Sequence, residues 1–243
     1  AQKQKADSMQ LLLIKQHSDT GRVQCMWKIA SYLYSYAPDS SLRIAQKALF
    51  PSQQIKYSEG ESRSLGQMAN AFLSMGNYPK ALEFYLRKLK LEEKAKNEYN
   101  LASVIMNIGI VYAYREEYDL SLYYLKQADS IIISRQLTDL RFNINLNLGD
   151  VYYRKNNTDS AYAYFDQSLQ RAQEMKDVDF TGTAMVGLGN TYLKAGRYDL
   201  ALKIYKAGIV FLFAADNEDF VCEAYLGLAK LYGETNEPDS SLH

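Results

Sequence analysis

The chain repeats itself every 40 residues, and this periodicity constrains its fold more than any other feature. In each step a small residue is followed three positions later by an aromatic residue, and twelve positions later by a second small residue. The first small residues are Ala69, Gly109, Gly149, Gly189 and Ala229; the aromatic residues are Tyr32, Phe72, Tyr112, Tyr152, Tyr192 and Tyr232; the second small residues are Ser41, Ala81, Ser121, Ala161, Ala201 and Ser241. A pattern that recurs in phase along the whole chain predicts a repeat architecture.

Within one step the apolar spacing is that of an α-helix. Leu188, Tyr192 and Ala195 lie three or four residues apart, and a short polar break such as 155–157 divides each step in two. Three residues that follow such breaks are expected to cap a second helix by accepting hydrogen bonds from its first amides: Asp119, Asp159 and Asp199. Each step is therefore expected to be a helix, a tight turn and a second helix.

These pairs predict an all-α fold, because no strand alternation competes with the helical pattern. Neither helix of a pair can bury its apolar stripe alone, so successive pairs are expected to stack into one continuous solenoid. We expect a single domain over 1–243, in which 1–21 is the helix of a preceding unit. The expected repeats are 22–61, 62–101, 102–141, 142–181, 182–221 and a truncated 222–243. The truncation suggests a segment of a longer protein.

The residues at the in-phase positions carry a resemblance to a known family. The segments 148–152 and 188–192, followed by Ala161-x-x-x-Phe165 and Ala201-x-x-x-Tyr205, resemble the L-G-x-x-Y and A-x-x-x-F pattern of tetratricopeptide repeats. The step is longer than the roughly 34 residues typical of the family, and Lys88 stands where alanine is expected. The resemblance implies a right-handed α-solenoid of stacked antiparallel helix pairs. The longer step is similar to the sensor or scaffold region of bacterial, Bacteroidetes-like signalling proteins.

Composition argues against catalysis and against several partners. Lys and Arg number 28, as do Asp and Glu, so no global field attracts nucleic acid. Cys25 and Cys222, with His17 and His243, are too few and too scattered for a metal site or a histidine-led triad. We therefore expect no enzyme, no cofactor and no metal. Because the two cysteines belong to the first and sixth pairs, we also expect no intramolecular disulfide.

No segment of the sequence is long and apolar enough to span a bilayer. The longest apolar run, 208–215, is far shorter than the roughly 20 residues that a membrane helix requires. No signal peptide opens the chain as given. We expect no direct membrane insertion, and the sequence leaves open whether the protein is cytoplasmic or periplasmic.

The resemblance implies that the first helices line a concave face that binds a protein or a peptide. Helical phase places on this face Asn70, Asn107, Tyr114, Asn143, Asn147, Asp150, Tyr153, Arg154, Asn190, Lys194 and Lys230. Asparagine is unfavourable inside a helix and offers both a donor and an acceptor, which suits the backbone of an extended peptide. The alternative is that these amides bond one another or water. Some proteins of this family bind the C-terminal carboxylate of a partner through paired Lys, Arg and Asn on adjacent first helices. We do not expect this mode here, because Asn143 and Asn147 stand where the resemblance would require Lys and Arg.

Two other functions compete with peptide binding. The first is self-association, because the second helix of the fifth pair carries Phe211 and Phe213 where the fourth pair is polar. Either the missing second helix of the sixth pair or another copy of the chain would cover these rings, and the sequence leaves both open. The second is a small-molecule site in the aromatic lining. We expect a non-enzymatic binding scaffold or sensor region, with self-association as the alternative.

Overall fold

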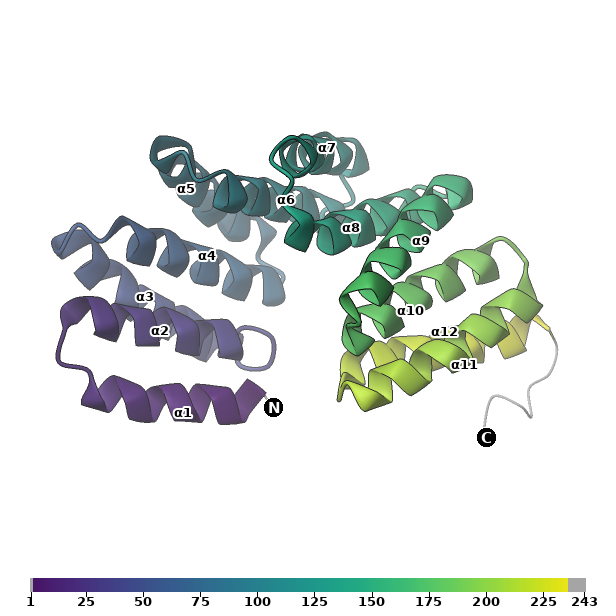
Figure 1. Ribbon diagram of the computed structural model, residues 1–243, viewed down its shortest axis with the longest axis horizontal. Helices are drawn as coiled ribbons and strands as arrows, with labels where there is room; N and C mark the ends of the chain where they lie inside the picture. The colour runs from purple at the N-terminus through teal and green to yellow at the C-terminus, as the bar shows by residue number, and fades with distance from the viewer. Residues whose placement is uncertain (1, 236–243) are drawn as a thin grey trace. The chain divides into compact units, whose positions relative to one another are not determined.

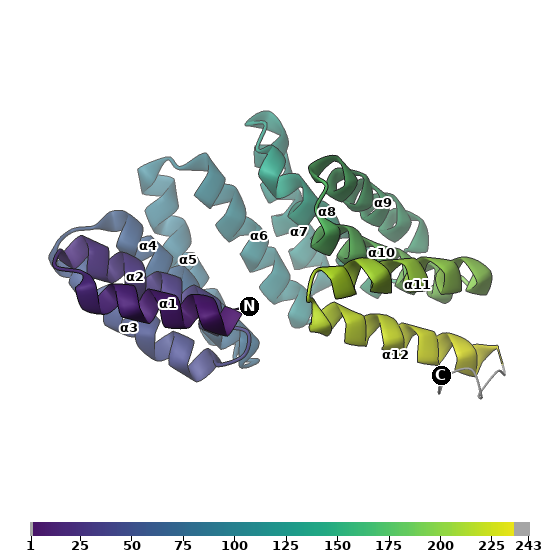
Figure 2. The same ribbon diagram turned by 60° about the horizontal axis from the view of Figure 1, so that its bottom comes forward.

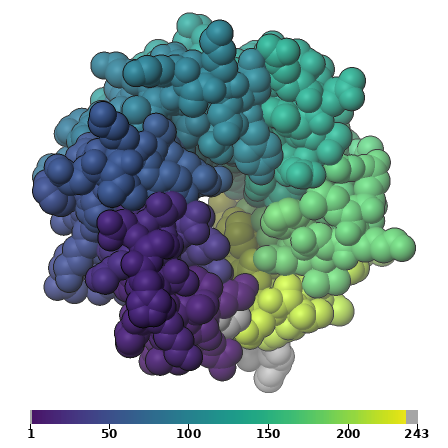
Figure 3. All heavy atoms as spheres, turned by 60° about the vertical axis from the view of Figure 1, so that its left-hand side comes forward, coloured from purple at the N-terminus to yellow at the C-terminus, as the bar shows by residue number. Residues whose placement is uncertain are grey.

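The structure is a computed structural model, which describes residues 2–235; residue 1 and residues 236–243 are drawn in grey in Figures 1, 2 and 3. The predicted small residue Ser241 lies outside the described residues. The chain separates into two compact units, residues 1–128 and 129–243, which we describe one at a time. That the whole chain is one domain with the repeat boundaries given above stays a prediction.

The first unit is a stack of helices that alternate in direction (Figure 1). Its helices are α1 (Gln2–Lys15), α2 (Asp19–Leu33), α3 (Pro38–Gln54), α4 (Ser58–Ser74), α5 (Tyr78–Ala95), α6 (Glu98–Tyr114) and most of α7 (Tyr118–Ser134). In the space-filling view of Figure 3, the purple part of the chain packs directly against the blue part. Helices α2, α4 and α6 are the first helices of their pairs.

The second unit repeats the same arrangement. After a 3-10 turn at Thr138–Leu140, its helices are α8 (Arg141–Arg154), α9 (Thr158–Met175), α10 (Val178–Lys194), α11 (Tyr198–Ala214) and α12 (Glu218–Glu234). Helices α11 and α12 lie side by side in Figures 1 and 2. The described residues contain no strand, and the predicted all-α solenoid of helix pairs is confirmed.

The phased small and aromatic residues lie where the two helices of a pair meet. A Cβ atom added to Gly189 would lie 2.6 Å from Cε1 of Tyr205, so only glycine lets the two helices approach this closely. Three of the phased aromatic rings stack on a ring of the following helix twelve residues later. The ring centroids are 5.5 Å apart for Phe72 and Phe84, 5.3 Å for Tyr112 and Tyr124, and 5.5 Å for Tyr152 and Tyr164.

The second helices bury the same four positions in every pair. The buried residues are Ser41, Ala45, Ala48 and Ser52 in α3; Ala81, Tyr85, Lys88 and Glu92 in α5; Ser121, Leu125, Ala128 and Ile132 in α7; Ala161, Phe165, Ser168 and Ala172 in α9; and Ala201, Tyr205, Gly208 and Leu212 in α11. This spacing is one face of an α-helix. Burial at these positions is therefore a property of the repeat and not of the residue type.

The predicted aspartate caps are wrong. Helix α9 begins at Thr158, two residues earlier than a cap at Asp159 requires, and the cap is Asn157, whose Oδ1 accepts a hydrogen bond of 3.0 Å from the Ser160 amide. The aspartates lie inside the first turns of their helices instead: Asp119, Asp159 and Asp199. There a carboxylate stabilises the helix through its dipole, which is a different interaction from a cap.

Both cysteines are free thiols, Cys25 buried in α2 and Cys222 exposed on α12. None of the helices in the described part of the chain has the length and apolar character needed to cross a membrane.

Candidate functional site

The predicted binding residues lie on the first helices, distributed over both units. The first unit holds Asn70 on α4 and Asn107 and Tyr114 on α6; the second holds Asn143, Asn147, Asp150, Tyr153 and Arg154 on α8, Asn190 and Lys194 on α10, and Lys230 on α12. Tyr114, Arg154, Lys194 and Lys230 are exposed, and the other seven are half-buried.

In the second unit, residues of α8 and α10 interact directly. The Lys194 ammonium donates a hydrogen bond of 2.7 Å to the Tyr153 carbonyl and lies 4.3 Å from the centre of the Tyr153 ring. The next residue of α8, Arg154, forms an ion pair with Asp150 one turn earlier, in which Nε and Oδ2 are 2.8 Å apart. Desolvation raises the pKa of Tyr153, and the negative charges of Glu223 and Asp150 raise it further. These residues form one charged cluster, the α8–α10–α12 cluster: Asp150, Tyr153, Arg154, Asn190, Lys194, Glu223 and Lys230.

Glu223 of α12 belongs to this cluster, although the sequence did not single it out. Asn190 donates a hydrogen bond of 2.9 Å to Glu223 Oε1. Desolvation of the Glu223 carboxylate raises its pKa, and the nearby Asp150 carboxylate adds to this. The signal in the sequence was its place in the repeat, since Glu223 lies 80 residues after Asn143, which was predicted to face the groove.

Lys194 and Lys230 are like charges held near each other. Desolvation lowers the pKa of Lys194, and the positive charge of Lys230 lowers it further. Neither lysine forms an ion pair with a carboxylate of residues 2–235. The cluster therefore presents two cations from adjacent first helices, neither of which is paired with a carboxylate of the described residues.

Two of the predicted asparagines have an internal role. The buried Tyr205 hydroxyl donates to Asn190 Oδ1 at 2.5 Å, and the buried Tyr85 hydroxyl donates to Asn70 in the same way, three repeat steps earlier. A buried hydroxyl needs such an acceptor. The Asn147 side chain donates to the carbonyl of Asn143 in its own helix, at 2.7 Å. Three of the five predicted asparagine side chains therefore have partners within the chain, and these are mainly groups other than the neighbouring asparagine amides or water.

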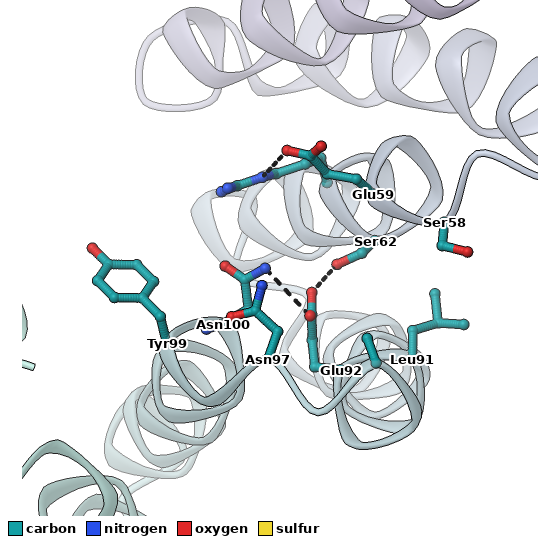
Figure 4. Close-up of a pocket in the computed structure, with 10 residues that line it drawn as sticks. Ser58, Glu59, Ser62, Leu91, Glu92, Asn97, Tyr99 and Asn100 are labelled. Atoms are coloured by element: carbon teal, nitrogen blue, oxygen red, sulfur yellow. Dashed lines mark hydrogen bonds and ion pairs between the residues drawn. The ribbon is translucent and has the colours of Figure 1, made fainter. Parts of the chain in front are cut away.

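A second polar cluster lies in the first unit, around the irregular Lys88. Lys88 Nζ lies 2.9 Å from Glu92 Oε1 and donates to Ser62 Oγ at 2.7 Å, while Ser62 also donates to Glu92. Asn100 Nδ2 donates to the second Glu92 oxygen at 3.3 Å. Lys88 and Glu92 are 7% and 3% exposed, so this is a buried ion pair with its hydrogen bonds satisfied. We call these four residues the Lys88 network; Figure 4 shows Glu92 between Ser62 and Asn100.

The environment keeps Glu92 ionised. Burial by itself would raise its pKa, but hydrogen bonds from Ser62, Lys88 and Asn100 and the charge of Lys88 hold the pKa below its usual value. Burial lowers the pKa of Lys88, which the hydrogen bond and the charge of Glu92 oppose.

The two predicted phenylalanines of α11 differ in exposure. Phe213 is 62% exposed, whereas Phe211 is half-buried. Val210, which lies on the same face of α11 as Phe213, is 68% exposed. Residues 2–235 contain no group of three His, Cys, Asp or Glu side chains that would hold a metal ion.

Comparison with known proteins identifies the family. The tetratricopeptide repeat model matches residues 60–128 and 140–209, which is more than half of the chain. The chain belongs to the tetratricopeptide repeat family. Repeats of this kind typically form non-catalytic interaction scaffolds whose curved surfaces bind other proteins. No curated protein matches the sequence.

Three solved structures illustrate the proteins that share this fold. BtubC (BKLC) from P. vanneervenii is 18% identical with a TM-score of 0.66, over 88% of this chain and 89% of that one. The Rap conjugation gene regulator of plasmid pLS20, in complex with the Phr* peptide, is 16% identical with a TM-score of 0.73, over 90% and 59%. A STAND protein with a tetratricopeptide repeat sensor from Pyrococcus horikoshii is 14% identical with a TM-score of 0.68, over 92% and 35%. The chain therefore spans only part of the Rap protein and of the STAND protein.

Proposed function

We propose that the tetratricopeptide repeats of this chain bind a peptide through the α8–α10–α12 cluster. The observation that carries the proposal is the pair Lys194 and Lys230, which lie on adjacent first helices and have no carboxylate partner among the described residues. An acidic side chain or carboxylate of a ligand would relieve the repulsion between them. The Tyr153 ring beside Lys194 offers apolar surface for the neighbouring part of the ligand.

In this proposal the main contacts with the peptide come from Lys194 and Lys230, whereas the argument from sequence relied on the asparagine side chains. Asn190 already holds Tyr205 and Glu223, so its role is to position Glu223 and the α10 surface. The presence of a bound peptide in the similar Rap regulator supports a ligand of this class. The tetratricopeptide sensor of the similar STAND protein supports a role as the sensing part of a larger regulator.

The test uses peptides selected from a random display library on the purified chain. Replacing both lysines, K194A/K230A, removes two charge-assisted hydrogen bonds and should weaken binding at least about tenfold. The control is K203A/K206A, which removes two exposed lysines from the outer face of α11 in the same unit. We expect selected peptides to be acidic and their binding to weaken with salt. Equal affinity of both double variants would place the binding surface elsewhere.

Self-association through α11 is a second candidate, and the repeat supports it. The positions of Val210 and Phe213 are exposed in every second helix, also where another pair follows: Lys90 and Glu93, Ser130 and Ile133, and Gln170 and Gln173. A further pair of the same kind would therefore leave Val210 and Phe213 uncovered, so a second copy of the chain is the better candidate to cover them.

Sedimentation velocity over a range of concentrations tests this second candidate. V210Q/F213Q should dissociate an oligomer that the wild-type chain forms, since it removes the apolar contact and leaves the buried face of α11 intact. The control Y123Q changes an apolar side chain that is 57% exposed on α7. A wild-type chain that stays monomeric at high concentration would rule out self-association.

A further inference from the structure

The Glu223 carboxylate on α12 is held in place without a cation bound to it. Asn190 Nδ2 donates a hydrogen bond of 2.9 Å to Glu223 Oε1, and the oxygen of the same amide accepts a hydrogen bond from the buried Tyr205 hydroxyl. Glu223 forms no ion pair with a Lys or Arg side chain of residues 2–235. Since Glu223 is exposed, its unpaired charge is open to a ligand.

A second carboxylate, that of Asp150 on α8, lies close to Glu223. Desolvation raises the pKa of Glu223 and the charge of Asp150 raises it further, while the hydrogen bond from Asn190 and the charge of Arg154 lower it. Arg154 is already paired with Asp150, with Nε and Oδ2 2.8 Å apart. A further cation beside Glu223 would therefore stabilise its ionised form.

The charges of the α8–α10–α12 cluster are ordered along the helices. On each of the three first helices a cation lies C-terminal to an acidic or amide side chain: Arg154 to Asp150, Lys194 to Asn190, and Lys230 to Glu223. Seven residues separate Glu223 from Lys230, which is two helical turns or about 10 Å. The cluster thus has an acidic end at Glu223 and a basic end at Lys194 and Lys230.

The first unit shows that the fold does not require these charges. It contains the same internal hydrogen bond, from the Tyr85 hydroxyl to Asn70, 120 residues before the bond from Tyr205 to Asn190. The charged positions of the second unit hold uncharged residues there: Ser103 for Glu223, Ser74 for Lys194 and Ile110 for Lys230. The charges are therefore additions to a shared packing pattern, and a binding surface is where such additions are useful.

We infer that the peptide bound by the α8–α10–α12 cluster carries a cationic group as well as an acidic one, and that Glu223 selects the cation. This inference rests on the proposed function and specifies its ligand. The ligand cation, which is a Lys or Arg side chain or the free amino terminus, donates hydrogen bonds to the Glu223 carboxylate, while Lys194 and Lys230 donate to the ligand carboxylate. An extended peptide advances about 3.3 Å per residue, so the two ligand charges lie roughly three residues apart. Opposite charges at the two ends of the cluster also determine the direction of the peptide.

Calorimetric titration with peptides selected on the wild-type chain tests the inference. We expect the selected peptides to carry a cationic group roughly three residues from Asp or Glu. E223Q removes the charge and keeps an acceptor for Asn190, so it should weaken binding of these peptides at least about tenfold. Replacing the ligand Lys or Arg by norleucine should weaken binding to the wild type by a similar factor and change binding to E223Q little. Acetylation of the peptide distinguishes the amino terminus from a side chain as the source of the cation.

The matched control is E218Q, which changes an exposed glutamate in the first turn of the same helix and should bind as the wild type does. Circular dichroism will show that both variants fold. If E223Q retains full affinity while K194A/K230A loses it, the inference is wrong and the proposed function stands. If neither variant loses affinity, both are wrong. Equal losses in E223Q for peptides with and without the cation would also overturn the inference, because Glu223 would then act only on the shape of the site.

Discussion

Three equivalent positions of the repeat are polar in the first unit and apolar in the second. In the first unit two of these positions hold Ser62 and Asn100, which both donate hydrogen bonds to the buried carboxylate of Glu92 at the third. In the second unit, 80 residues later, the same positions hold a stack of Phe142 and Phe180. The backbone pattern is shared, yet these positions form part of an ion-pair network in the first unit and an aromatic contact in the second.

The difference teaches that the repeat determines burial while the local set of side chains determines chemistry. Lys88 occupies a position that is Ala128, Ser168 or Gly208 in later repeats, and it is buried as they are. Its long side chain is accommodated because Gly66 faces it: a Cβ added there would lie 3.4 Å from Lys88 Cδ. A charge is tolerated at such a position only when partners arrive with it.

The largest expected effect comes from breaking the Lys88 network. E92A leaves the Lys88 ammonium buried without its carboxylate and should lower the free energy of unfolding by about 3–5 kcal/mol. The control is E93A, the exposed neighbour on the same helix, which should change it by less than about 0.5 kcal/mol. Urea denaturation followed by circular dichroism measures both. Equal midpoints for the two variants would contradict a stabilising role of the pair.

A transplant sharpens the comparison by giving the first unit the side chains that the second unit has at these positions and at the position of Lys88. The quadruple change S62F/K88S/E92A/N100F reproduces Phe142, Ser168, Ala172 and Phe180. Replacing a buried ion pair by well-packed apolar residues is often neutral or stabilising by about 1–4 kcal/mol, and we expect that range here. Thermal unfolding measures the change. A strongly destabilised product would mean that the first unit cannot close around the rings.

The pH dependence of stability should differ between the wild type and E92Q. The pKa of Glu92 is lower in the folded chain than its usual value, so ionised Glu92 stabilises the fold fully above about pH 4.3. As the pH falls through the folded pKa this stabilisation is lost. The difference in unfolding free energy between wild type and E92Q should therefore be largest near neutral pH and shrink in acid. A difference that stays constant from pH 7 to about pH 3 would be evidence against the ionised state.

The smallest expected effect concerns the tyrosine–asparagine bonds that both units share. Y205F removes the hydroxyl that bonds Asn190 and should cost about 0.5–1.5 kcal/mol, and Y85F should cost about the same in the first unit. Because Asn190 also holds Glu223, only Y205F is expected to weaken peptide binding. Denaturation and peptide titration of the two variants separate these effects, and equal loss of affinity would show that the hydroxyls act only through stability.

Much of the architecture was predictable because the spacing of small and apolar residues within each repeat determines the helix pairs. The phase of small and aromatic residues predicted the helix pairs and the family, but not the stacked rings such as Phe72 on Phe84. The aspartate caps were predicted wrongly, since the helix boundary lies two residues earlier, which makes Asn157 the cap and places Asp159 inside the first turn.

The partners of the polar side chains were decided by the tertiary structure alone. Helical phase predicted that Asn190 lies on the concave face. It could not predict the hydroxyl partner Tyr205 and the carboxylate partner Glu223, which come from two other helices. Likewise Lys88 looked like a mismatch until Ser62 and Glu92 were placed around it. Spacing along one helix determines which face a residue occupies. A hydrogen bond also requires the identity and distance of groups 15 to 33 residues away, as for these bonds, and only the packed helices bring those groups together.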